Sequence, residues 1–242
     1  MKKSNLVLAL GLLISPLCSQ ANDGGIESPP KLIVKNSVKE VIDNYVKAIG
    51  GEAKMKDIRN MEMNMEAEIQ GMQLVISGVT DQENKRMANL TEMNGNVVSK
   101  TIVKDGAGTV SAMGQEQALT EAQVAAVLKN QVYVFRELYL DELGVTAVFE
   151  GTEEVEGEEA YKLSFETGGD GNTTEYYSVA TGLKIQTKSD IAGTILYKDY
   201  EDVDGLMMPM TMVIKNNMIP MPLEAKVTSI KFNQDLDDSV FN

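Results

Sequence analysis

The chain has 242 residues and a formal net charge of −14 at pH 7, from 36 acidic and 22 basic side chains. So acidic a chain is a poor partner for nucleic acid or an anionic membrane surface, because both attract basic proteins. It contains no histidine, which excludes serine–histidine and cysteine–histidine catalysis and every zinc site with a histidine ligand.

The amino terminus, residues 1–21, has the layout of a secretory signal peptide. Met1–Lys3 is basic, Leu6–Leu17 is almost wholly apolar, and Ser19–Ala21 places small residues where a signal peptidase cuts. The apolar run is shorter than the roughly 20 residues that a bilayer-spanning helix needs. We therefore expect cleavage between Ala21 and Asn22, which exports the rest of the chain as a soluble protein of the bacterial periplasm.

The chain's one cysteine, Cys18, offers an alternative, because a cysteine at the end of such a segment can be lipid-modified in a lipoprotein. That processing requires a small residue before the cysteine, and Leu17 is bulky. The sequence therefore favours cleavage at Ala21 over a lipid anchor at Cys18. Without Cys18, the exported chain has no disulfide, no thiol nucleophile and no thiolate metal ligand.

A helix is predicted over Ser37–Ile49. Ser37 and Glu40 form a capping-box pattern, and the apolar side chains that follow recur at helical spacing. Gly50–Gly51 then supplies a stop signal. A short helical turn is expected around Glu52–Ile58.

After residue 60 the apolar side chains recur at every second position, as in a strand with one apolar face. From Met61 to Gln70, methionine, alanine and isoleucine alternate with glutamate, asparagine and glutamine. Further strands are predicted between turn signals, over Met72–Val79, Lys85–Met93 and Val97–Val103.

Thr120–Asn130 lacks the alternation of apolar and polar residues that is typical of a strand. Thr120 and Gln123 form a second capping-box pattern, and two valines and a leucine follow on one face, so we predict a second helix. The apolar segment Val132–Leu143 is compatible with an extension of this helix or with a lid.

From Val145 onward the sequence again alternates. Strands are predicted around residues 161–166, 175–179, 183–188, 195–200, 207–215 and 223–232. The alternation slips between Val227 and Ile230, which predicts a β-bulge. Strands and turns at this spacing predict an antiparallel sheet with both helices on one side. We expect a flexible leader over residues 22–36 and a single mostly β (α+β) domain over residues 37–242.

No arrangement of residues indicates catalysis. The acid pairs Glu153–Glu154, Glu158–Glu159 and Asp237–Asp238 lie in turn-like or tail contexts, which favours solvated surface charge over the two-carboxylate cleft of a glycosidase. Oxygen-bearing residues from Asp170 onward have calcium-loop spacing, but Tyr176 stands where that loop requires glycine. We expect no catalytic residue, no bound metal and no cofactor.

Methionine is the unusual feature of the composition, with 15 residues. Two predicted strands gather methionine and isoleucine on one face, and we predict that these side chains line an apolar cavity: Met61, Met63, Met65, Ile69, Met208, Met210, Met212 and Ile214. Unbranched, polarisable thioethers suit a deformable site for an acyl chain or a hydrophobic segment. A packed core and a copper(I) site remain alternatives, the latter because soft ligands select that ion.

Four stretches occur in a suggestive order, namely Val41–Gly51, Thr174–Lys184, Tyr200–Pro209 and Val227–Asn233. Together they span most of the exported chain. In this order the chain resembles the periplasmic lipoprotein-carrier, or outer-membrane lipoprotein-sorting, superfamily, including the similar domains appended to pitrilysin-like zinc peptidases. The resemblance implies a strongly curved antiparallel half-barrel with helices covering its concave face, and an apolar cavity that accepts acyl chains.

The methionine faces and the resemblance together predict a non-enzymatic periplasmic binding or carrier protein that holds a lipid acyl chain or a lipoprotein. Two alternatives stay open. One is a structural or interaction module of the cell envelope, with a packed core and a protein partner. The other is a copper(I)-binding protein that uses methionine alone.

Overall fold

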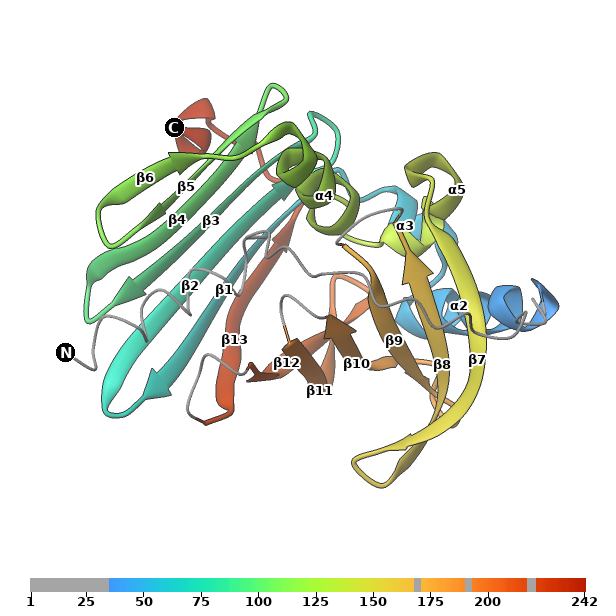
Figure 1. Cartoon of the computed structure of the whole chain (residues 1–242). Helices are drawn as coiled ribbons and strands as arrows, with labels where there is room; N and C mark the ends of the chain where they lie inside the picture. The colour runs from blue at the N-terminus through green and yellow to red at the C-terminus, as the bar shows by residue number, and fades with distance from the viewer. Residues whose placement is uncertain (1–34, 168–170, 190–192, 217–220) are drawn as a thin grey trace, which may run out of the picture.

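In the computed structural model, which describes residues 35–167, 171–189, 193–216 and 221–242, the chain forms one open antiparallel sheet of 13 strands. The strand order is β6-β5-β4-β3-β2-β1-β13-β12-β11-β10-β9-β8-β7. Figure 1 shows the strong curvature that the half-barrel prediction requires. The predicted signal peptide with Cys18, and the leader up to residue 34, lie outside the described residues.

The first six strands form a meander in which each strand pairs with the next: β1 (Asn60–Ile69), β2 (Met72–Asp81), β3 (Arg86–Met93), β4 (Asn96–Lys104), β5 (Ala107–Ala112) and β6 (Gln115–Ala118). The structure confirms the first four predicted strands to within two residues. The sequence does not predict the β5–β6 hairpin, because β5 consists largely of small residues and every side chain of β6 is exposed. Neither strand therefore presents a recognisable apolar face.

The remaining strands form a second meander: β7 (Thr146–Val155), β8 (Glu158–Glu166), β9 (Thr173–Ser178), β10 (Lys184–Ser189), β11 (Gly193–Val203), β12 (Leu206–Lys215) and β13 (Leu223–Phe232). The two meanders join where β1 pairs with β13. There Asn64 lies opposite Ser229 and Met65 lies opposite Val227, so that Thr228 is skipped. This register shift confirms the predicted bulge.

Helix α2 (Lys35–Ile49) contacts β7 and β12 and buries one apolar stripe, Val41, Tyr45 and Ile49. The structure corrects the predicted cap: Ser37 lies inside α2 rather than before it. Helix α3 (Glu52–Lys56) confirms the predicted short helical turn.

The end of α2 lies against the turn between β11 and β12. Gly50 has a backbone φ of +139°, and a Cβ atom there would lie 2.4 Å from the carbonyl oxygen of Gly205. Glycine alone combines this conformation with so close an approach. Gly50 therefore both ends the helix and lets it dock on the sheet.

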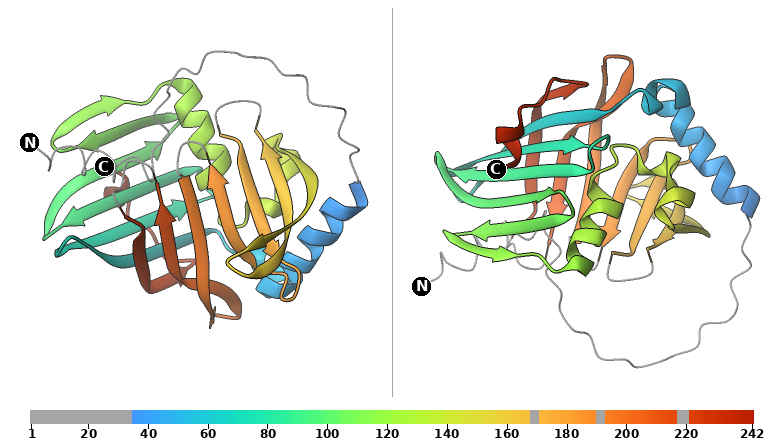
Figure 2. Two further views of the ribbon diagram at one scale, coloured as in Figure 1. Left: turned by 60° about the horizontal axis from the view of Figure 1, so that its bottom comes forward. Right: turned by 90° about the horizontal axis from the view of Figure 1, so that it is seen from above.

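Helix α4 (Glu121–Gln131) begins with the predicted capping box. The Gln123 backbone N–H donates to Thr120 Oγ1 at 3.3 Å, and the Thr120 backbone N–H donates to Gln123 Oε1 at 2.8 Å. The segment after it does not extend this helix but forms two short helical turns, η1 (Arg136–Leu138) and α5 (Leu140–Leu143). Figure 2 shows α4 lying between the two halves of the sheet.

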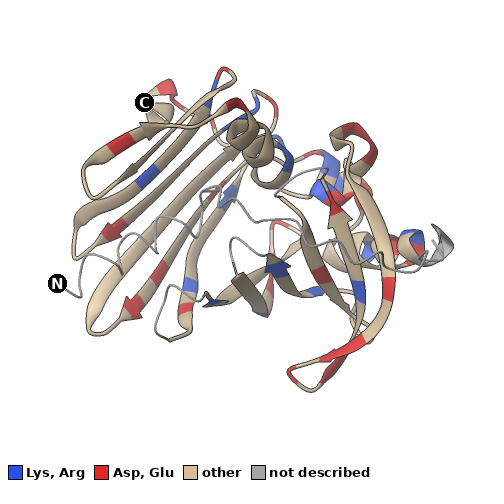
Figure 3. Cartoon of the chain, viewed as in Figure 1, with Lys and Arg blue, Asp and Glu red and all other residues tan. Residues whose placement is uncertain are grey.

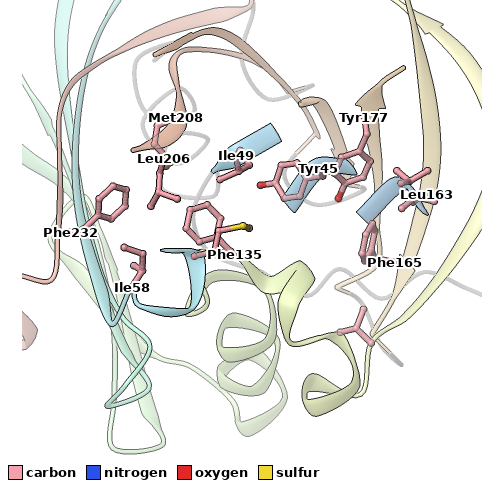
Figure 4. Close-up of a cluster of buried hydrophobic side chains, with 13 residues drawn as sticks. Tyr45, Ile49, Ile58, Phe135, Leu163, Phe165, Tyr177, Leu206, Met208 and Phe232 are labelled. Atoms are coloured by element: carbon pink, nitrogen blue, oxygen red, sulfur yellow. The ribbon is translucent and has the colours of Figure 1, made fainter. Parts of the chain in front are cut away.

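The largest core cluster fills the space between α2 and the concave face of the sheet. It joins α2 to side chains of β8, β9, β12 and β13 and to Phe135, which precedes η1. Figure 4 shows the rings of Tyr45 and Tyr177 side by side in this cluster, and they meet edge to face with centroids 5.2 Å apart. A smaller cluster packs α4 onto Met87 and Val103. The helices thus cover the concave face, as predicted.

The chain ends in a short turn, η2 (Asp238–Phe241), which contacts β3 and β4. Phe241 is buried there, and the Arg86 guanidinium lies 4.2 Å from its ring centroid. In the part of the chain that the structure describes, no helix combines the length and apolar character needed to cross a membrane.

Candidate functional site

The concave face holds an open cavity of about 440 Å³ between the two halves of the sheet. Its walls come from β1–β3, from β9–β12, and from the segment running from α4 to η1. The volume falls in the range of roughly 300–1,000 Å³ that is typical of ligand sites. Two of its walls have opposite character, one rich in methionine and the other charged.

The methionine wall comes from β1 and its neighbours. Met61, Met63 and Met65 all line the cavity and are half-buried, as is Met212 of β12. They share the lining with two isoleucines, Ile76 and Ile195. Because strand side chains alternate between faces, the intervening polar residues of β1 point away from the cavity.

The other predicted lining residues lie beyond the cavity. Met208 belongs to the large core cluster beneath α2. Ile69 and Ile214 belong to a second cluster that also contains Leu74 and Leu223. Met210 is half-buried and lies outside the cavity lining. A ten-residue strand is about 33 Å long. The apolar faces of β1 and β12 therefore line the cavity over part of their length and pack as core elsewhere.

The charged wall brings together four ionisable side chains from three segments. Arg136 and Glu137 come from η1, Glu175 from β9 and Lys184 from β10, and all four line the cavity. Arg136 forms an ion pair with Glu175, and Lys184 pairs with Glu137 and, at 2.6 Å, with Glu175. None of these side chains is more than 15% exposed.

Uncharged partners complete this network. The Tyr177 hydroxyl lies 3.1 Å from a carboxylate oxygen of Glu137 and 2.8 Å from one of Glu175. The Arg136 guanidinium donates to Asn130 and Thr173 and lies 5.0 Å from the ring centroid of Phe165. A buried network of this kind is stable only when its members are mutually satisfied.

The ion pairs keep the network charged despite its burial. Burial raises the pKa of Glu175, but Arg136 and Lys184 outweigh it and bring the pKa down to about 2. Burial lowers the pKa of Lys184, yet Glu137 and Glu175 raise it well above its usual value. Burial also raises the pKa of Tyr177, which keeps its hydroxyl protonated and able to donate.

The sequence does not predict the charged wall. Strict alternation would place Lys184 with Gln186 and Lys188 on a polar face. In the structure the pairing of β10 with β9 skips Ile185, which puts Lys184 opposite Tyr177. The available signals were the charged pair Arg136–Glu137 within an apolar segment and Glu175 within an otherwise uncharged strand.

A larger hollow of about 860 Å³ lies on the opposite face of the same strands, as the alternation of Tyr176 with Glu175 shows. Among its charged side chains, Glu153 contacts Lys162 at 3.1 Å and Lys188 at 3.5 Å. Its lining is mostly polar. It lacks the apolar wall that an acyl chain requires, so the smaller cavity is the candidate site.

A scan against protein-family models finds no match, and no curated protein matches the chain. Solved structures match its fold. A DUF1329 family protein from Desulfovibrio piger is 12% identical, with a TM-score of 0.52 over 85% of this chain and 97% of that one. A LolA superfamily protein from Nitrosomonas europaea is 10% identical, with a TM-score of 0.52 over 88% of this chain and 98% of that one.

A domain from Vibrio parahaemolyticus, assigned to outer membrane lipoprotein sorting, is also 10% identical, with a TM-score of 0.51 over 85% of this chain and 97% of that one. At these identities the likeness concerns the fold. The chain therefore has the half-barrel fold of these structures, which is the fold that the sequence resemblance implies.

Proposed function

We propose that this protein is a non-enzymatic carrier of the bacterial periplasm, and that its cavity holds an acyl chain of a lipid or lipoprotein. The observation that carries the proposal is the cavity of about 440 Å³ with methionine along one wall. The signal-peptide layout of residues 1–21 supports export.

The methionine wall suits an acyl chain for two reasons. Each methylene group that leaves water for an apolar surface contributes about 0.8 kcal/mol, so a long chain gains several kilocalories from burial along β1. The thioether side chains of Met61, Met63 and Met65 are flexible enough to repack around chains of different length and saturation.

The comparisons support the same class of function. Two of the matching structures carry names from the LolA superfamily and from outer membrane lipoprotein sorting. One fold can host several functions, so the proposal rests on the cavity and uses these names only as support.

The residues support the absence of an enzymatic role in this proposal. The chain has no histidine, and the four charged side chains in the cavity lining are held in ion pairs with one another. A general base or nucleophile must be able to approach a substrate atom. Paired and buried carboxylates that already accept several hydrogen bonds do not meet this condition.

Native mass spectrometry of the protein, purified gently from the periplasm, tests the proposal directly. Lipid extraction of the same sample then identifies any bound molecule. We expect an added mass that resolves to a fatty acid, phospholipid or lipoprotein fragment. A bare protein that also takes up no uncharged fluorescent apolar dye after delipidation would contradict the proposal and favour the interaction module.

A pair of variants separates an open cavity from a packed core. Met63→Glu places a carboxylate in the cavity, and we expect it to weaken binding of an uncharged fluorescent apolar dye at least tenfold while the folded protein persists. Met221→Glu makes the same chemical change at a side chain that is 53% exposed, and it should bind as the wild type does. If Met63→Glu abolishes folding instead, Met63 is packed core, because a buried unpaired charge destabilises the whole fold.

A further inference from the structure

The polar wall of the cavity carries balanced charge. Arg136 and Lys184 supply two positive charges, and Glu137 and Glu175 supply two negative charges. No other Asp, Glu, Lys or Arg of the described residues lines this cavity. The wall is therefore neutral as a whole, inside a chain whose formal charge is −14.

From this balance, and resting on the proposed function, we infer that the cargo is an amphiphile with a net-neutral polar head group, zwitterionic or uncharged. Its apolar tail lies along the methionine wall and its head group against the charged wall. The same cavity supplies both surfaces, so one ligand contacts them together.

An anionic head group is disfavoured because no base in the lining is free to receive it. Lys184 already contacts two carboxylates, and Arg136 contacts Glu175, Asn130 and Thr173. The incoming anion would lose its hydration and meet two carboxylates as closely as two bases. The overall negative charge of the protein opposes it further.

A cationic head group is also disfavoured, because both carboxylates of the wall are already paired with bases. A zwitterion differs because it brings no net charge into the cavity, so its two ends lie beside ion pairs of opposite polarity without leaving either sign of charge in excess. Uncharged groups in the lining, the amides of Asn89 and Gln131 and the hydroxyl of Thr187, provide hydrogen-bond partners for an uncharged head group.

The test compares amphiphiles that share one hydrocarbon-chain length and differ in head group, each below its micelle-forming concentration. The set is a lysophosphatidylethanolamine, a monoacylglycerol, a lysophosphatidylglycerol and an alkyl trimethylammonium. Displacement of an uncharged fluorescent apolar dye from the delipidated wild-type protein gives each affinity. We expect the first two to bind at least tenfold more tightly than the anionic and cationic members.

Charge-changing variants test the cause of the selectivity. Glu175→Gln leaves the wall with an excess positive charge and should shift the preference at least tenfold toward lysophosphatidylglycerol. Lys184→Gln leaves an excess negative charge and should shift it toward the cationic amphiphile. Glu153→Gln removes a carboxylate on the opposite face of the sheet and should leave the selectivity unchanged.

The possible outcomes are distinguishable. If none of the four amphiphiles binds, the proposed carrier function fails. If the wild type binds lysophosphatidylglycerol as tightly as the net-neutral pair, the carrier function stands and the head-group inference is overturned. The wild-type comparison decides the question even if neither cavity variant folds.

Discussion

Replacement of Glu175 by glutamine should destabilise the fold strongly, because Glu175 is the acid that both bases of the charged wall share. The substitution would keep the shape of the side chain but remove its charge. Arg136 would then lose its acidic partner while remaining buried, and Lys184 would keep Glu137 alone. A base without its acid in a buried site carries an uncompensated desolvation cost.

Two routes give the size of the effect. Removing one partner of a buried ion pair costs about 3–5 kcal/mol. Lowering the pKa of Glu175 from 4.5 to about 2 corresponds to a stabilisation of about 3 kcal/mol, at about 1.36 kcal/mol per pKa unit. In a domain of this length, about 3 kcal/mol lowers the Tm by about 6–12 °C.

The pH dependence follows from the direction of the same shift. The folded-state pKa of Glu175 is about 2, below the value of about 4.3 for an unfolded chain. The contribution of the Glu175 carboxylate to stability is therefore complete above its unfolded-state pKa and is lost as the pH falls through its folded-state pKa. The stability difference between the wild type and Glu175→Gln should hold from pH 7 to pH 5 and shrink by about 2 kcal/mol by pH 3.

Urea unfolding of both proteins at a series of pH values measures these differences, with thermal unfolding at pH 7 as a second readout. Glu153→Gln is the matched control, because Glu153 contacts two lysines but is 41% exposed, and exposed pairs contribute at most about 1 kcal/mol. A Glu175→Gln protein whose Tm lies within about 2 °C of the wild type would refute the reasoning, as would a stability difference that does not change between pH 5 and pH 3.

Two further predictions concern helix ends. Thr120→Ala removes the side chain that accepts from Gln123 and should lower the free energy of unfolding by about 1 kcal/mol, with Thr120→Ser restoring most of it in urea unfolding. Gly50→Ala should lower the free energy of unfolding by more than backbone strain alone, which costs about 1–3 kcal/mol. The reason is that the new Cβ would lie 2.4 Å from the Gly205 carbonyl oxygen. Gly51→Ala, with φ +97° and no atom within 4 Å, carries the strain without the contact, so equal destabilisation by the two variants would contradict this account.

The sequence predicts those parts of the fold that depend on local pattern. The second capping box, the alternating strands and the bulge at Thr228 each leave a signal in neighbouring residues. The β5–β6 hairpin leaves none, because its strands are held by backbone pairing and its β6 side chains remain exposed. The capping-box pattern at Ser37 predicts a helix start there, but α2 extends beyond it toward the amino terminus.

The site could be predicted in part. Met61, Met63, Met65 and Met212 line the cavity, whereas Met208, Ile69 and Ile214 lie in packed core. The curvature of the sheet away from its helices decides which part of a strand's apolar face lines the cavity. The alternation of apolar and polar residues carries no information about this curvature. The charged wall depends on a register shift at Ile185 and on contacts between segments some 40 residues apart.

Surface charge is unevenly distributed over the sheet. Figure 3 shows acidic residues gathered at the tip of the β7–β8 hairpin. Edge strands offer unpaired backbone groups to other chains, and charged side chains discourage such pairing. The acids of β7, among them Glu153 and Glu154, therefore protect one of the two open edges of the sheet.

The strand order also governs how the sheet can assemble. Every neighbouring pair in it is a hairpin between consecutive strands, except β1 with β13. At that seam Asn60 hydrogen-bonds to Gln234, 174 residues further along the chain. Hairpins form within about 1–10 μs, whereas a contact between such distant residues must wait for a large loop to close. When the chain emerges with its amino terminus first, the first meander can form long before the residues of β13 have emerged. Until β13 pairs with it, β1 is an edge strand, and its methionine face lacks the second half of the sheet.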